Sequence, residues 1–467
     1  MGTKSRVGIT CVIGCLLLWC GCGSPTAFHR SSPVASLKAI SPNSSRVGGA
    51  GFTLSVVGSD FVSGATVQWN ETSLPTSFVN TTYLTAEVPA SALSAAEPVA
   101  ITVLNPAFSN ASNALNFALP CVIPAPTPAA AQSQARLGAY FFDGWSGSLT
   151  NMHFQGLPFG DYEDREPLSG WQDNTTCSVE QQLAWARNIG IDFFVFDWYF
   201  NALANDPGEN LNSALEVTKS LPDRHGMQFA ILYVDSPPFV IQPADWNAAI
   251  DQWMSYMTDP GYVLVNGKPL LIVYDMGMMV QTFGSADSVA GAFDELRAAA
   301  QAQGLPGVYI VGVMPTSYTP GCAQPAFFLN ESVPEGYDAL TVYNYSVGCV
   351  SESQPFSVLS AAGHSTWGDI LRHNLSPFIP VAGDGWDARP WQEGNIWFSR
   401  SPQEVTNFVA DAIEWANSNP QFRPEPSPAP PLVLIEAWNE VGEGSYLIPT
   451  VSEGTSYGDS LAEMLAH

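Results

Sequence analysis

The stretch at residues 431–449, PLVLIEAWNEVGEGSYLIP, decides how the rest of the chain is interpreted. Residues 432–435 are all apolar, which is typical of a parallel strand buried on both faces. The strand leads into Glu440, Glu443 follows three residues later, and the glycines around Glu443 allow a sharp turn. Two carboxyl groups at a strand end can supply an acid and a base to one polar ligand such as a sugar. We therefore predict Glu440 and Glu443 as catalytic residues, against the alternative that both are solvated loop acids.

The composition indicates a large globular protein with an acidic surface. With 467 residues and 46% hydrophobic residues, the chain can form two or three domains around a large core. It has 43 acidic against 16 basic residues, a formal net charge of -27, which disfavours nucleic acid and anionic membrane surfaces as partners. The composition predicts no oligomeric state.

The first residues have the pattern of a bacterial lipoprotein export signal. Lys4 and Arg6 precede an apolar run at residues 7–19, which is shorter than the roughly 20 residues that span a membrane. We expect a signal peptide over residues 1–22 with Cys22 as the lipidated residue. Cys15 fits the usual lipobox letters better but leaves a short apolar core. The protein is thus expected in the periplasm or at the cell surface, with a lipid anchor as its contact with the membrane.

After Cys22, the remaining cysteines are Cys121, Cys177, Cys322 and Cys349. An exported chain meets oxidising conditions, so that disulfides are expected, and four cysteines allow three pairings. We favour Cys322 with Cys349, because both follow adjacent predicted strands. No cysteine pair has zinc-type spacing, so we expect neither a metal nor a cofactor.

Short segments of alternating polarity at residues 36–119 predict a small β-sandwich. The run from Gly51 through Phe61 to Asn70 resembles the immunoglobulin-like IPT/TIG domain. Its expected role is that of a spacer or docking module, with glycan binding as the alternative. The Pro- and Ala-rich residues 120–135 are expected to be a semi-stiff linker.

From residue 136 to 467, apolar runs alternate with helix-like segments. This pattern predicts a (β/α)₈ barrel, with a doubly wound open sheet as the competing layout, although no glycine-rich phosphate turn supports a nucleotide-binding sheet. The eight expected strands are residues 137–142, 193–199, 228–235, 269–275, 308–314, 339–345, 378–387 and 432–440.

Acidic and aromatic residues gather at the carboxyl ends of these strands, where such barrels place their chemistry. Each one alone is more simply explained as a strand-end cap or a loop residue. Together they predict a sugar-binding cleft, since aromatic rings stack on sugar rings and carboxylates or amides bind hydroxyls. The predicted substrate-binding residues are Tyr140, Asp143, Trp145, Asp197, Trp198, Tyr199, Asp235, Tyr274, Tyr343, Asn344, Trp386, Asp387, Arg389, Trp438, Asn439 and Tyr446.

Several motifs of this region resemble glycoside hydrolase family 99 and the family-99-like domain of polysaccharide-biosynthesis proteins. They are GAYF at 138–141, EPLSGW at 166–171, GIDFFVFDWY at 190–199, GWDAR at 385–389 and AWNEVGEG at 437–444. The resemblance implies a retaining hydrolase of α-linked polysaccharide, with mannose as a candidate sugar. It assigns the base to Glu440, which helps the sugar 2-oxygen attack C1, and the acid to Glu443, whose pKa is then expected to be raised.

The sequence departs from the family beside the two acids. Val441 stands where the family has a bulky Trp, and Gly442 stands where a residue like His is common. The resemblance therefore predicts a smaller wall at this place and a site open to other sugars.

Three other functions remain open. Trp438-Asn439-Glu440 also resembles the acid motif of the large clan of retaining glycosidases, although that clan places it on the fourth strand. A non-catalytic lipoprotein that holds glycan in the barrel is the second alternative. Glycosyl transfer from nucleotide sugars is disfavoured, because the chain has no Asp-x-Asp motif and an exported protein does not meet such donors.

Overall fold

The computed structural model describes residues 34–96, 99–106, 110–119, 121–125, 134–146, 152–158, 160–205, 210–316, 334, 336–347, 352–392 and 396–467. The predicted signal peptide, Cys22 and the favoured pair Cys322 and Cys349 lie outside these residues. In the described parts, no helix has both the length and the apolar character needed to cross a bilayer.

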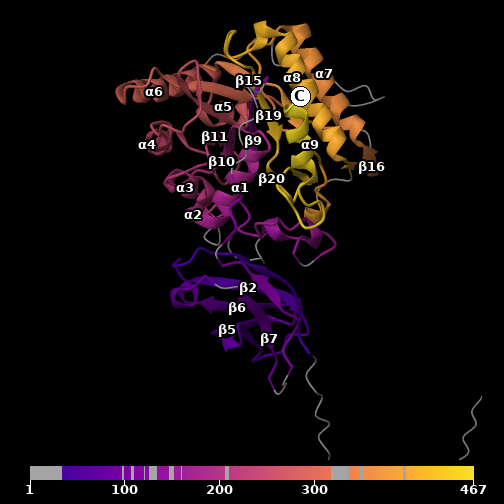
Figure 1. Cartoon of the computed structure of the whole chain (residues 1–467). Helices are drawn as coiled ribbons and strands as arrows, with labels where there is room; N and C mark the ends of the chain where they lie inside the picture. The colour runs from indigo at the N-terminus through magenta and orange to yellow at the C-terminus, as the bar shows by residue number, and fades with distance from the viewer. Residues whose placement is uncertain are drawn as a thin grey trace, which may run out of the picture.

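The N-terminal residues form the predicted β-sandwich (Figure 1). Alternate residues of the strands, such as Leu54, Val56, Leu84 and Val103, are fully buried between the two sheets, because successive side chains of a strand point to opposite faces. One sheet has the order β1 (Ser36–Ser41), β2 (Phe52–Ser59), β6 (Tyr83–Val88), β5 (Thr76–Asn80). The other has the order β4 (Thr72–Ser73), β3 (Thr66–Trp69), β7 (Val99–Leu104), β8 (Leu115–Phe117).

The second domain is a barrel of parallel strands, and all eight predicted strands are present. Its path closes where Leu340 bridges Phe378 and the Ile379 amide donates to the Leu340 carbonyl at 2.9 Å, so the doubly wound alternative is excluded. The strands in spatial order are β15 (Ala339–Thr341), β14 (Tyr309–Val313), β13 (Lys268–Val273), β11 (Gln228–Tyr233), β10 (Phe193–Trp198), β9 (Arg136–Phe141), β19 (Leu432–Glu436) and β17 (Val381–Gly383).

Helices surround the barrel, as Figure 1 shows. Their buried faces carry apolar residues at helical spacing, for example Val405, Phe408, Val409 and Ala412 of α8, which cover the outside of the strands. The longer helices are α1 (Thr176–Asn188), α3 (Ser213–Ser220), α4 (Trp246–Met257), α5 (Met276–Phe283), α6 (Ala286–Ala302), α7 (Phe356–His373), α8 (Pro402–Ser418) and α9 (Ser456–Leu465).

The described start of the linker is attached to the barrel. Cys121 forms a disulfide with Cys177 of α1, and Gln181 of the same helix donates to the carbonyl of Val122 at 2.9 Å. The outer face of the β1–β2–β6–β5 sheet also meets the barrel, where Val57 and Tyr83 are buried. The linker therefore does not hold the two domains apart, since the sandwich packs directly on the barrel.

Candidate active site

The alternation of strand residues selects which side chains enter the barrel mouth. Asp197 and Trp198 are adjacent at the end of β10, so they point to opposite sides. Asp197 lines a cavity inside the rim, whereas the Trp198 ring packs against Trp253 of α4 with 5.4 Å between centroids. Trp198 is therefore part of the packing between sheet and helix and does not line the cavity.

The cavity has a volume of about 310 Å³, within the usual size range of small-ligand sites. Five predicted residues line it: Asp197, Tyr199, Tyr274, Tyr343 and Glu440. Seven further lining residues were not predicted: Phe142, Met152, His153, Gln155, Val234, Ser236 and Trp391.

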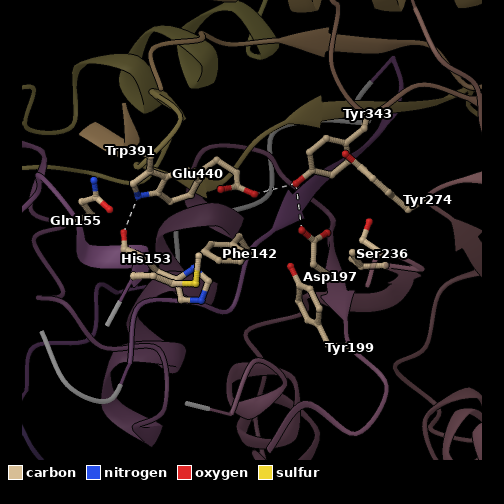
Figure 2. A pocket seen from close by; sticks show the side chains of 12 residues that line it. Phe142, His153, Gln155, Asp197, Tyr199, Ser236, Tyr274, Tyr343, Trp391 and Glu440 are labelled. Carbon is tan, nitrogen blue, oxygen red and sulfur yellow. Dashed lines mark hydrogen bonds between the residues drawn. The ribbon is translucent and has the colours of Figure 1, made fainter. Parts of the chain in front are cut away.

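The hydroxyl of Tyr343 joins the two carboxyl groups of the cavity (Figure 2). It lies 2.9 Å from Oε1 of Glu440 and 3.1 Å from Oδ2 of Asp197. A phenol has one hydrogen to donate, so both hydrogen bonds can exist together only if one carboxyl is protonated and donates to the phenol oxygen. This geometry suits one extra proton shared among the three groups better than it suits two ionised carboxylates.

The electrostatics of the cavity favour this shared proton. Burial, and next the charge of Asp197, raises the pKa of Glu440 to about 8, while the hydrogen bond from Tyr343 acts in the opposite direction. Burial likewise raises the pKa of Asp197 well above its usual value. Among the described residues, the second oxygen of Asp197, Oδ1, is buried without a hydrogen-bond partner, so it can accept a hydrogen bond from a ligand hydroxyl.

Glu440 and Glu443 lie at the two ends of a tight turn. Asn439 and Glu440 form β20 (Asn439–Glu440), which pairs with β21 (Ser445–Tyr446). Gly444 has φ +71°, and a Cβ there would lie 2.7 Å from Cβ of Asp387, so this position requires glycine. Arg165 holds the turn from outside by donating to the carbonyl of Val441 at 3.0 Å and to the Asp387 carboxylate.

Glu443 is more exposed than Glu440 and is not among the residues that line the cavity. It is nevertheless close to the cavity, because its charge adds to burial in raising the pKa of both Tyr274 and Asp197. Its backbone amide donates to the carbonyl of Glu440 at 3.1 Å. The second acid thus lies beside the cavity that the first acid lines.

The small residues beside the acids do not leave an open wall. Val441 is fully buried and does not line the cavity, and a Cβ at Gly442 would overlap the Trp391 ring. Trp391 lines the cavity and donates from its indole to the carbonyl of His153 at 2.8 Å. The prediction of a smaller wall is therefore wrong at this place, since an aromatic ring from another loop fills it.

Several predicted residues stabilise the rim without lining the cavity. Asp143 accepts hydrogen bonds from Ser213 and from the backbone of Ala214 at the start of α3. Asp235 accepts from the amide of Asp275 at 2.7 Å. Asn439 binds the backbone of Phe142 in both directions, at 2.9 and 2.8 Å. These contacts hold strand ends and loops together.

The remaining candidates are packed away from the cavity. Tyr140 lies beneath Tyr343, with 4.6 Å between ring centroids. Asp387 is paired with Arg165 and Arg389, which lowers its pKa although burial acts to raise it. Five other predicted residues do not line the cavity either: Trp145, Asn344, Trp386, Trp438 and Tyr446.

The missed residues come mainly from loops. His153, Gln155 and Trp391 lie between predicted elements, where no periodic pattern shows which way a side chain points. Phe142 and Val234 lie at the ends of predicted strands and Ser236 directly follows Asp235, so their positions at strand ends were the available signal. Within the described residues, no group of three or more His, Cys, Asp or Glu side chains could hold a metal ion.

Comparison with known proteins finds two family models in this chain. The model described as "Glycosyltransferase WbsX" matches residues 239–461, and the IPT/TIG domain model matches residues 35–118. No curated protein matches the chain.

Some solved structures match one domain of this chain, and one matches most of its length at low identity. The family 99 endo-alpha-mannosidase of Bacteroides thetaiotaomicron is 15% identical over 68% of this chain and 88% of its own, with a TM-score of 0.43. A family 123 glycoside hydrolase from Clostridium perfringens is 9% identical over 90% of this chain and 82% of its own, with a TM-score of 0.35. The TIG domain of human nuclear factor of activated T-cells, cytoplasmic 4, is 23% identical over 19% of this chain and 91% of its own, with a TM-score of 0.17. The chain thus combines an N-terminal IPT/TIG domain with a barrel of which residues 239–461 match the WbsX family model.

Proposed function

We propose that the protein is a retaining glycoside hydrolase that cleaves α-linked polysaccharide at the cavity of Glu440. The observation that carries this proposal is the pair of buried carboxyl groups, Asp197 and Glu440, that both lie within hydrogen-bond distance of the Tyr343 hydroxyl at the mouth of the barrel. Groups that exchange protons near neutral pH are what acetal hydrolysis requires. The aromatic rings of the lining provide stacking surfaces for sugar rings.

In the proposed first step, Glu440 takes the proton of the sugar 2-hydroxyl. The 2-oxygen then forms a bond to C1 while the bond from C1 to the leaving oxygen breaks, and Glu443 gives its proton to that oxygen. For this step Glu440 must be ionised, which is achieved when the shared proton resides on Asp197 and Tyr343 donates to Glu440. Glu440 can then accept the proton of the substrate.

In the second step, the 1,2-anhydro sugar is opened. Glu443 removes a proton from water, the water oxygen bonds to C1, and the 2-oxygen leaves C1 and takes back a proton from Glu440. Both acids return to their starting states, and the configuration at C1 is retained because it is inverted twice.

The name of the matched family, a glycosyltransferase, makes transfer to an acceptor sugar the second candidate. Such transfer would use the same first step, with an acceptor hydroxyl in place of water. Transfer from a nucleotide sugar is disfavoured, because the described lining has two carboxyl groups and no Lys or Arg to bind a diphosphate. Holding glycan without cleaving it is the third candidate.

The test uses purified full chain with α-mannan and a panel of α-linked oligosaccharides. Glu440→Gln and Glu443→Gln are each expected to lower kcat by about 10²–10⁴-fold, the usual contribution of a general acid or base. Glu463→Gln on the exposed side of α9 is the matched control and should keep full activity. Unchanged turnover in either cavity variant contradicts the proposal.

Product analysis separates the candidates. Hydrolysis in H₂¹⁸O places the label at C1 of the new reducing end, whereas transfer yields elongated products without label. Binding of the panel with no bond broken would instead support a glycan-binding protein. The large clan of retaining glycosidases is disfavoured, because Glu440 follows β19, the last barrel strand in the described residues.

We further propose that the protein is exported and anchored by a lipid at Cys22. The support is the basic and apolar pattern of residues 1–22. Growth of expressing bacteria with a labelled fatty acid should label the protein, and Cys22→Ser should abolish the label. Labelling that persists in Cys22→Ser but is lost in Cys15→Ser would move the anchor to Cys15.

A further inference from the structure

A second and larger cavity lies between the sandwich and the barrel. Its volume is about 660 Å³, and it shares no lining residue with the cavity of Glu440. The sandwich contributes Thr53, Ser55 and Thr85, and the barrel contributes Trp171, Gln172 and Asn174. This interdomain cleft is within the usual size range of ligand sites.

The alternation of two strands makes the sandwich wall polar. In β2 and β6, Leu54 and Leu84 face the sandwich core, so their neighbours Thr53, Ser55 and Thr85 face the opposite way, into the cleft. The same outer face is apolar at Val57, where it packs against the barrel. The outer face of this sheet therefore packs directly on the barrel near Val57, whereas near Thr53, Ser55 and Thr85 it borders the cleft with hydroxyl groups.

The chemistry of the lining favours an uncharged, hydroxyl-rich ligand. Tyr83, which lies on the same outer face as Thr85, is an aromatic residue of the lining. Arg46 is the one charged side chain among the lining residues, and it is paired with Glu180. An anionic ligand would therefore find no free cation in the described lining and would be repelled by the acidic protein.

Two residues that line this cleft each have a buried polar atom without a partner in the described part of the chain. Trp171 and Gln172 are each 2% exposed, and neither Nε1 of Trp171 nor Oε1 of Gln172 has a hydrogen-bond partner among the described residues. Buried polar atoms are nearly always hydrogen-bonded in folded proteins. A hydroxyl group that reaches them could satisfy both, because it can accept a hydrogen bond from Nε1 and donate one to Oε1.

The cleft is also held in place covalently. Cys177, which lines it, is bonded to Cys121, and Ser41 donates to the carbonyl of Trp171 at 2.6 Å. A site whose walls are fixed before binding loses less entropy when the ligand enters. From these observations together, we propose that the interdomain cleft is a second saccharide-binding site, specific for neutral sugars, which holds a glycan chain away from the cavity of Glu440.

The experiment measures saccharide binding by calorimetry in the full chain carrying Glu440→Gln, which keeps the probes intact. The neutral probes are α-linked mannotetraose and maltotetraose, and tetragalacturonate is the anionic probe. Two equivalents of a neutral probe are expected to bind. Thr85→Trp or Thr53→Trp, added separately, should fill the cleft and weaken one equivalent at least tenfold. Thr72→Trp, on an exposed strand of the other sheet, is the matched control, and both equivalents of probe should still bind to it.

Circular dichroism and thermal melts of each variant show whether weaker binding is caused by unfolding. Because two cleft variants are made independently, the test still works if one of them does not fold. The proposal is overturned if neutral probes bind with one equivalent that both tryptophan variants leave unchanged, which would make the cleft a water-filled gap. Tighter binding of tetragalacturonate at the cleft would overturn its specificity. If the tryptophan variants lose one equivalent and the protein with Glu440 intact cleaves no glycan, the cleft is supported and hydrolysis is refuted. Cleavage by the protein with Glu440 intact, without any cleft site, would do the reverse.

Discussion

The hydroxyl of Tyr343 lies 2.9 Å from Glu440 and 3.1 Å from Asp197, so one phenol controls the protonation of two carboxyl groups. Because its hydrogen bond lowers the pKa of Glu440, Tyr343→Phe should raise that pKa further. We expect kcat/KM to fall about 10²-fold, and its acidic limb, which reports ionisation of Glu440 as base, to move to higher pH. The pH dependence of kcat/KM measures both effects.

Asp197→Asn should shift the same limb in the opposite direction. The charge of Asp197 helps burial to raise the pKa of Glu440, so a neutral amide should lower it and move the acidic limb to lower pH. Tyr309→Phe, at the other end of the barrel in β14, is the matched control for both variants and should leave the profile in place. Shifts of the same sign in Tyr343→Phe and Asp197→Asn would contradict the shared proton.

The free energy of unfolding should decrease as the pH rises from about 5 to about 8. In this interval Glu440, with a pKa of about 8 in the folded protein, keeps a proton that the unfolded chain, with a Glu pKa of about 4.3, has lost. The folded state then binds more protons than the unfolded state, so stability falls with rising pH. Asp384 and Asp173, whose pKa values burial raises to about 7, act in the same direction.

Glu440→Gln isolates the contribution of Glu440 to this pH dependence of stability, since an amide resembles the protonated acid at every pH. The variant should gain melting temperature over the unmodified protein at pH 8 and show little difference at pH 5, as measured by scanning calorimetry. Glu463→Gln should change neither value. Parallel melting curves for Glu440→Gln and the unmodified protein across this range would show that Glu440 is ionised throughout.

Trp391→Ala should weaken substrate binding, because it removes an aromatic face from the cavity. Aromatic contacts contribute about 0.5–1.5 kcal/mol beyond the area they bury, so KM should rise about tenfold or less while kcat changes little. Gly442→Ala should raise KM in the same way, since the added Cβ would displace the Trp391 ring. Steady-state kinetics on one defined oligosaccharide measure both variants.

The double variant tests whether the two residues act together. If Gly442→Ala acts only by moving the ring, it should have no further effect in the Trp391→Ala background. Additive effects on KM would show that Gly442 contributes independently of Trp391.

Arg165→Lys should disturb the turn that carries the two glutamates. The arginine donates to two carbonyls, of Val441 and Asp387, each at 3.0 Å, and to the Asp387 carboxylate. A lysine cannot reproduce this fork, so we expect a lower melting temperature and a kcat reduced about tenfold. Arg187→Lys alters a more exposed pair with Asp192, where an ion pair contributes about 0–1 kcal/mol, and it should be nearly neutral. Equal losses in both variants would show that the fork of Arg165 contributes nothing beyond the cost of an ordinary Arg-to-Lys exchange.

The sequence alone was sufficient for the architecture of both domains. Apolar runs predicted all eight barrel strands, because a strand buried on both faces needs a continuous run of apolar residues. Alternation in residues 52–56 and 84–88 predicted the sandwich, because a strand with one buried face needs an apolar residue at every second position. The position of Glu440 at the end of the last predicted strand placed it at the rim, since all parallel strands of a barrel end on one side.

Only the tertiary structure decided which rim residues meet. Tyr343 is separated from Asp197 by 146 positions and from Glu440 by 97, so no local pattern could indicate that one hydroxyl joins both acids. Nor could it indicate that Trp391, from a distant loop, fills the space beside Gly442. Strand periodicity determines the side of a sheet to which a residue points, but the distance between two side chains depends on how the whole barrel closes and how its loops pack.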